Sequence, residues 1–259
     1  MSGDLLAGWP AGSSAAALVV REGGATVVAE AGDLDERRAW ASVSKLAVAL
    51  AMGVEHDAGL HDLAEDAGPP GATIAHLLSH SAGLGLEEGD RTSPVGARRV
   101  YSNYGVDLAV NAVVDGTDPA RWLAERVLTP LGMSTSALKG RPSSGVVGST
   151  RDLVTLAEAW LQPDTITQAT RDRMIAPFLP GLAGVVPGFG RFDPCPWGLG
   201  PEVAGAKRHW MGGWPPESFG HFGQSGSLAL MNASEGFAVV ATAGEAFGSW
   251  AVQLWPAWT

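Results

Sequence analysis

Residues 42 to 59 read SVSKLAVALAMGVEHDAG and are the segment that tells most about the fold. Its middle is rich in Ala and Leu, which favour a helix, and Gly59 stands where such a helix would end. Because the central residues are almost all apolar, we expect the helix to be buried. Ser42 stands at its start.

Ser42 and Lys45 stand three residues apart, so a helix places their side chains on one face beside the positive end of the helix dipole. A neutral Lys45 can take the proton of the Ser42 hydroxyl, provided that burial or a nearby cation lowers the lysine pKa. The alternative interpretation is an ordinary helix cap at Ser42 followed by a solvated lysine. Ser44 points away from Ser42 on such a helix and is interpreted as structural.

Moving outward from this helix, apolar runs predict strands near both ends of the chain. The predicted strands cover residues 16–21, 25–31, 227–232 and 236–243, each pair being separated by a turn. In the middle of the chain the apolar residues have helical spacing instead, and they have it again at the C-terminal end. The predicted helices cover residues 72–80, 104–114, 119–128, 150–161 and 245–258.

Strands at both ends with helices between them predict an α+β fold of the α/β sandwich type. One antiparallel sheet would be built from both chain ends and flanked by helices, with a mainly helical lobe inserted. We expect a single domain over residues 1–259. Its sheet lobe would cover about 1–60 and 195–259, and its helical lobe about 61–194, with the cleft between them.

Two further polar elements follow the four residues from Ser42 to Lys45 along the chain. Tyr101-Ser-Asn103 lies in a loop before a predicted helix, and His221-Phe-Gly223 lies on a candidate strand. With Ser-x-x-Lys at 42–45, these elements make the sequence resemble the serine β-lactamase and penicillin-binding protein superfamily, in particular its class C and esterase-like branch. Further stretches resemble the same family: IAHLLSHSAGL at 74–84, VYSNYG at 100–105, STRDL at 149–153 and WGLG at 197–200.

The resemblance implies a set of roles for these residues. Ser42 would be the nucleophile, Lys45 its activator, Tyr101 a general base or acid toward the leaving group, and Asn103 a hydrogen-bond donor to Lys45 or substrate. The oxyanion hole would be formed by the backbone N–H groups of Ser42 and Gln224. Substrate would lie along the strand and contact the four residues His221, Phe222, Gly223 and Ser225. The reaction so implied passes through an acyl-enzyme and needs no cofactor and no metal.

One departure from the family concerns charge. Relatives that cleave β-lactams commonly carry Lys-Thr-Gly where this chain has His221-Phe-Gly223, and a neutral imidazole and a phenyl ring offer less to a substrate carboxylate. Arg208, His209 or Arg151 are candidates to supply the missing cation. Without one, efficient β-lactamase activity is not expected.

Aromatic and acidic residues suggest two further features of the site. Phe222 and the tryptophans Trp197, Trp210 and Trp214 can wall an apolar pocket suited to small neutral esters, or can simply fill core. The acidic residues Glu87, Glu88 and Asp90 are interpreted as a solvated loop, which leaves no evident carboxylate base for deacylation. Slow turnover is the consequence.

Other candidate sites are weaker. His76 and His80 have the spacing of zinc ligands on a helix, but Leu77 stands where the metalloprotease motif needs Glu and no third ligand is evident, so both are interpreted as structural. Cys195 is the only cysteine and lies between two prolines, which excludes an intrachain disulfide and disfavours a catalytic thiol.

Composition narrows the partners. The chain has 27 Asp and Glu against 17 Lys and Arg, a formal net charge of −10, which disfavours nucleic acid. A secretory signal peptide has a cationic start followed by a continuous apolar stretch, whereas this chain has Asp4 and Pro10 there. No apolar run is long enough to span a membrane. We expect a cytoplasmic protein acting on a small-molecule ester, amide or β-lactam, with no nucleic-acid or membrane partner.

Two alternatives to an esterase or β-lactamase-like hydrolase stay open. A D-amino-acid peptidase or transesterase would need recognition of a terminal amine or carboxylate. A catalytically weak member of the family serving as a binding module would hold its ligand without turnover. The sequence does not choose a physiological substrate or an oligomeric state.

Overall fold

The computed structural model describes residues 6–22, 24–162, 164–207 and 209–254. A six-stranded antiparallel sheet forms its centre, with strand order β2-β1-β12-β11-β10-β9. The strands are β1 (Ser14–Arg21), β2 (Gly24–Ala31), β9 (Glu202–Val203), β10 (Phe219–Gly223), β11 (Ser227–Asn232) and β12 (Phe237–Thr242). Pairing of β1 with β12, from Ser14 opposite Thr242 onward, joins the two chain ends, which confirms the predicted α+β fold.

The helices come mostly from the middle of the chain. They are η1, a 3₁₀ turn (Ala41–Val43), α1 (Ser44–Asp57), α2 (Ile74–Leu78), α3 (Asn103–Val114), α4 (Pro119–Leu123) continued by the π-helical turn η2 (Ala124–Leu128), α5 (Thr150–Leu161), α6 (Gln168–Ile175) and α7 (Ser249–Leu254). None of these described helices is long and apolar enough to cross a membrane.

Two small sheets lie outside the central one. β3 (Arg38–Ala39), β6 (Val146–Gly148) and β5 (Ala137–Leu138) form the first, and β4 (Arg99–Val100), β7 (Gly184–Val186) and β8 (Gly190–Phe192) form the second. The sequence analysis predicted neither, because two- and three-residue strands are too short to carry an alternating pattern. It also missed α6, whose mostly polar sequence QATRDRMI has little apolar periodicity.

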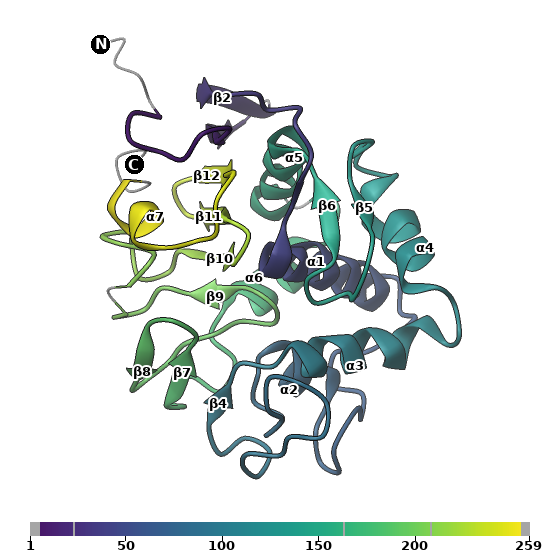
Figure 1. Cartoon of the computed structure of the whole chain (residues 1–259). Helices are drawn as coiled ribbons and strands as arrows, with labels where there is room; N and C mark the ends of the chain where they lie inside the picture. Colours follow the sequence, from purple (N-terminus) through teal and green to yellow (C-terminus); the bar gives the residue numbers. More distant parts are fainter. Residues whose placement is uncertain (1–5, 23, 163, 208, 255–259) are drawn as a thin grey trace.

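The central sheet is packed on both faces. Figure 1 shows α1 and α5 on one side and α7 on the other. On the first side, residues 46–51 of α1 are completely buried among side chains such as Phe219, Met231 and Val240. Thr150, at the start of α5, ties that helix to the sheet, since its Oγ1 lies 2.7 Å from Ser14 Oγ and 2.9 Å from Thr242 Oγ1. A second apolar cluster around Leu228, Trp197 and Phe222 fills the other face.

The predicted elements mostly form, with shifted ends. The hairpin of β1 and β2, the pair β11 and β12, and helices at 74–78, 103–114, 119–128 and 150–161 are confirmed. The terminal helix is shorter than predicted, covering Ser249–Leu254, and residues 255–258 of that prediction lie outside the described part. The helix predicted to begin at Ser42 also differs: Ser42 lies in η1, and α1 begins two residues later.

Candidate active site

Ser42 is held at a sharp entry to α1. The preceding residue, Ala41, has a φ of 44°, in the left-handed region that costs a non-glycine residue on the order of 1–2 kcal/mol. Strand β10 lies directly against this turn, because a Cβ added to Gly223 would come within 2.3 Å of the Trp40 carbonyl oxygen. Only glycine permits that approach, and it brings the end of β10 beside the serine.

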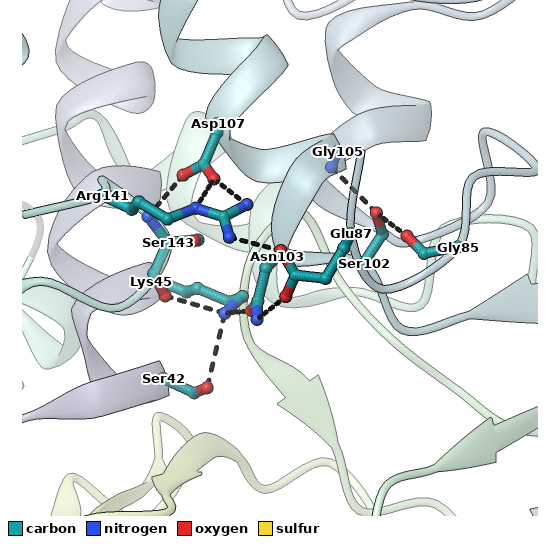
Figure 2. A network of polar contacts seen from close by, with 10 residues as sticks. All are labelled: Ser42, Lys45, Gly85, Glu87, Ser102, Asn103, Gly105, Asp107, Arg141 and Ser143. Atoms are coloured by element: carbon teal, nitrogen blue, oxygen red, sulfur yellow. Dashed lines mark hydrogen bonds and ion pairs between the residues drawn. The ribbon is translucent and has the colours of Figure 1, made fainter. Parts of the chain in front are cut away.

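Lys45 lies one turn further along and is buried, with 1% of its surface exposed. Its Nζ donates hydrogen bonds to Asn103 Oδ1 at 2.7 Å and to the Ser143 carbonyl oxygen at 2.8 Å, and lies 3.4 Å from Ser42 Oγ (Figure 2). Burial lowers the pKa of Lys45 to about 7, against the opposing attraction of the Asp107 carboxylate. The alternative of a capping serine and a solvated lysine is therefore wrong.

Tyr101 approaches Ser42 from the other lobe. It follows β4, and its hydroxyl donates a 2.8 Å hydrogen bond to Ser42 Oγ. Burial raises the pKa of the phenol, so it keeps its proton at neutral pH. His80 supports this loop, because its ring packs 4.5 Å from the Tyr101 ring and its Nδ1 accepts the Ser102 N–H at 3.2 Å.

His221 completes the inner group from strand β10. Its Nδ1 lies 2.7 Å from the Phe222 carbonyl oxygen and must donate to it, which leaves Nε2 as an acceptor 3.5 Å from the Tyr101 hydroxyl. Burial, with the nearby Lys45, lowers the pKa of this imidazole to about 3. His221 is therefore neutral at physiological pH.

An outer ring of polar groups holds Asn103 and Ser143 in place (Figure 2). Asn103 Nδ2 donates to Glu87 at 3.5 Å, and Arg141 bridges the carboxylates of Glu87 and Asp107. Asp107 in turn accepts the Ser143 N–H at 2.9 Å. Glu87 was predicted to lie in a solvated loop; it is exposed, but its carboxylate is part of this ring. Asn103 accepts from Lys45, whereas the sequence analysis predicted that it would donate.

A cavity of about 200 Å³ opens above Ser42. Its lining residues are Ser42, Leu86, Tyr101, Asn103, Val186, Pro187, Trp197, His221, Phe222 and Gln224. None of them is a cation or a carboxylate. Leu86, Val186 and Pro187 were missed, because an isolated apolar residue in a loop gives no sequence signal. Ser143 was missed for a related reason, since it contributes a backbone carbonyl.

Some predicted residues lie elsewhere. Ser225 Oγ donates to the Ala39 carbonyl oxygen at 2.6 Å, and Gly223 packs against the turn, so neither lines the cavity. Trp210 Nε1 donates to Glu202, and Trp214 stacks on Phe237 with ring centroids 5.5 Å apart. Trp210 is part of the core, Trp214 is partly buried against it, and Trp197 alone of the three lines the cavity.

Two of the three cations proposed to bind a substrate carboxylate are paired with acidic residues elsewhere. His209 Nε2 lies 2.6 Å from buried Glu202, and Arg151 pairs with Asp35 on an exposed surface. Arg208 lies outside the described residues. Within the described ranges no three His, Cys, Asp or Glu side chains gather as a metal site. His76 instead caps α2 through Thr73, and Cys195 is buried, which raises the pKa of its thiol.

Both the sequence and the fold of this chain are similar to those of known proteins. A family model for β-lactamases matches residues 9–248. The chain belongs to the β-lactamase family. A solved structure of a protein named as a β-lactamase from Mycobacterium bovis is 38% identical, with a TM-score of 0.92 over 98% of this β-lactamase-family chain and 94% of the other. A search of curated proteins returns no match.

More distant structures share the fold of this β-lactamase-family protein. Simvastatin synthase from Aspergillus terreus is 15% identical, with a TM-score of 0.76 over 95% of this chain and 91% of the other. EstCE1, a hydrolase with promiscuous acyltransferase activity, is 16% identical, with a TM-score of 0.74 over 94% and 93%. At such identities the likeness concerns the fold alone.

Proposed function

We propose that this protein is a serine hydrolase that cleaves neutral esters through an acyl-enzyme on Ser42. The observation that carries the proposal is the set of partners around Lys45. A neutral amine has two N–H donors and one lone pair, and the two short contacts, to Asn103 Oδ1 and the Ser143 carbonyl, use both donors. The lone pair is then left for the Ser42 hydroxyl, 3.4 Å away.

Acylation follows from this arrangement. The Ser42 proton passes to Lys45 while Oγ attacks the ester carbonyl, and the tetrahedral oxyanion is held by the backbone N–H groups of Ser42 and Gln224. Collapse breaks the bond to the alcohol, which takes up a proton from the Tyr101 hydroxyl. Lys45 holds the proton that restores Tyr101. His221 Nε2 lies 3.5 Å from the same phenol oxygen and is a second acceptor for its single proton when that proton is not donated to Ser42 Oγ.

Deacylation reverses the proton path. Water attacks the acyl carbonyl and gives its proton to the same pair of groups, releasing a carboxylic acid and regenerating Ser42. Because no carboxylate lines the cavity within the described residues, this step has no strong separate base. We expect an initial burst of alcohol followed by slower turnover.

The cavity's chemistry favours esters over the substrates of a β-lactamase or D-alanyl peptidase. Those substrates carry a carboxylate, whose burial without a cation costs several kcal/mol or more. Among the described residues, the walls of this cavity include Trp197, Phe222 and Leu86, and no lysine or arginine. A neutral ester has no charge to desolvate on entering it.

Intact-mass analysis tests the proposal. Wild-type protein incubated with a p-nitrophenyl ester or a fluorophosphonate should gain one adduct on Ser42, and Ser42→Ala should gain none and lose about 10⁴-fold or more in ester hydrolysis. An adduct that persists in Ser42→Ala, or no adduct on the wild type, would overturn it. Faster reaction with D-alanyl peptides than with esters would favour the peptidase, and ligand binding unchanged in Lys45→Ala would favour a binding module.

A further inference from the structure

A second cavity, of about 370 Å³, lies beside the one above Ser42. The two share Pro187, Phe222 and Gln224 in their linings, so they adjoin across these residues. The second continues from there toward the turn between β7 and β8 and toward helix α7, where Phe189, Phe247 and Val252 line it. The second cavity therefore lies next to the first, on the side formed by these three shared residues.

The second cavity is lined by aromatic side chains in contact with one another. Phe222 lies between Phe247, at a ring-centroid distance of 4.5 Å, and Phe189, at 5.5 Å. Its polar side chains are Gln224, Ser249 and Gln253, and none of its lining residues is charged. A ligand held there gains free energy by removing apolar surface from water.

The position of the proton-handling groups indicates which part of an ester faces this cavity. Tyr101 and Asn103 line only the first cavity, whereas Phe222 and Gln224 line both. The leaving alcohol needs the proton and therefore lies toward Tyr101. The acyl group of the same tetrahedral carbon is then directed to the other side, along Phe222 and Gln224.

We propose that the second cavity binds the hydrocarbon tail of the acyl group, so that the preferred substrates are esters of extended apolar or aromatic carboxylic acids. This inference rests on the proposed function. It makes Phe247 and Val252 residues that set chain-length specificity, although neither touches the reacting atoms. Acetate esters would react without filling the second cavity.

A series of p-nitrophenyl esters with acyl chains from acetate to dodecanoate tests the inference, because the leaving group stays constant. We expect kcat/KM to rise about threefold to fourfold for each methylene group that enters the cavity, and to level off once it is full. Val252→Trp should fill the cavity and remove that rise while leaving acetate hydrolysis within about twofold of wild type. Phe247→Ala should widen it and move the optimum to longer or bulkier acyl groups.

Val185→Trp is the matched control, because Val185 lies on β7, is 51% exposed and lines neither cavity. It should leave the chain-length profile unchanged. A flat profile on the wild type overturns the inference, as does a Val252→Trp variant that slows all esters equally while Phe247→Ala leaves the optimum in place. In either case acetate would still acylate Ser42 and the proposed function would stand. Failure of every ester to acylate Ser42 would instead overturn the proposed function and this inference with it.

Discussion

Two buried lysines in this protein have opposite surroundings. Lys45 and Lys207 are 1% and 3% exposed. Lys207 Nζ donates to the Glu202 carboxylate at 2.7 Å and to the Pro196 carbonyl oxygen at 2.8 Å. Lys45 contacts only uncharged oxygens, from Asn103, Ser143 and Ser42. Burial alone does not make a lysine a base; what matters is burial without a carboxylate in direct contact.

Lys207, His209 and Trp210 all donate to the buried Glu202 carboxylate, and these four residues form the Lys207 cluster. Burial pushes the pKa of Glu202 upward, but Lys207 and His209 outweigh it and hold that pKa at about 2. Trp210 Nε1 adds a third donor at 2.7 Å. Through Lys207 and the Pro196 carbonyl the cluster holds the segment from 196 to 207, which includes Trp197 in the wall of the cavity above Ser42. Its contribution to function is therefore indirect, through the shape of that wall.

Replacing each lysine by methionine gives the largest expected contrast. Lys45→Met should lower kcat/KM for esters by about 10⁴-fold or more, since it removes the base while filling the same space. Lys207→Met should leave Glu202 without its main partner and lower the free energy of unfolding by about 3–5 kcal/mol, measured by denaturant titration. Folded Lys207→Met protein should keep most of its activity. Equal loss of activity in both variants would contradict the contrast.

Giving Lys45 a carboxylate is the next test. Asn103→Asp places a negative charge where Oδ1 now lies 2.7 Å from Nζ, which should raise the pKa of Lys45 by about 1–3 units. At pH 7, where about half of wild-type Lys45 is neutral, the rate of acylation should fall by about 5- to 500-fold, and it should recover as the pH rises past the new pKa, between about 8 and 10. A rate that stays low at every pH would mean that the substitution damaged the site instead.

The sequence predicted the components of the site better than their surroundings. Ser42, Lys45, Tyr101 and His221 each carry a functional group in a recognisable spacing, and the structure brings all four together. What lowers the pKa of Lys45 is not visible in the sequence, because it depends on burial beside the backbone carbonyl of Ser143 with no described carboxylate in direct contact with Nζ. Spacing along a chain encodes neither.

The contacts of loop residues were not predicted for a similar reason. Glu87 is in an acidic stretch, and composition indicated a solvated loop, but Arg141 draws its carboxylate to Asn103. Trp210 and Trp214 are near β10 in sequence, yet Trp210 is held in the core by a buried carboxylate and Trp214 stacks on Phe237 beside it. The central sheet was predictable because its strands are long enough to carry an apolar pattern.

The pH dependence of the wild type gives a smaller effect. Because the pKa of Lys45 is lowered to about 7 and the neutral amine is the active form, kcat/KM should rise with pH, bend near 7 and level off above it. Below the bend each pH unit should cost about tenfold. His221, with a pKa of about 3, should add no inflection between pH 5 and 9. Initial rates on an ester that does not ionise measure the profile.

The smallest expected effect concerns the outer ring. Glu87 favours the charged form of Lys45 from an exposed position, so Glu87→Gln should lower the pKa of Lys45 by less than about half a unit. Rates at pH 6 should rise by less than about threefold. The difference from wild type should shrink in 1 M salt, whereas a change caused by lost positioning of Asn103 would be insensitive to salt.

The most direct test is a titration of the lysine side chains by NMR. The chain has three lysines, and replacing Lys45, Lys139 and Lys207 in turn assigns the three ¹³Cε signals. The Lys45 signal should change with a midpoint near pH 7 in the free protein. A Lys45 signal that keeps its ammonium shift through pH 9 would contradict the account, because no neutral amine would then face Ser42.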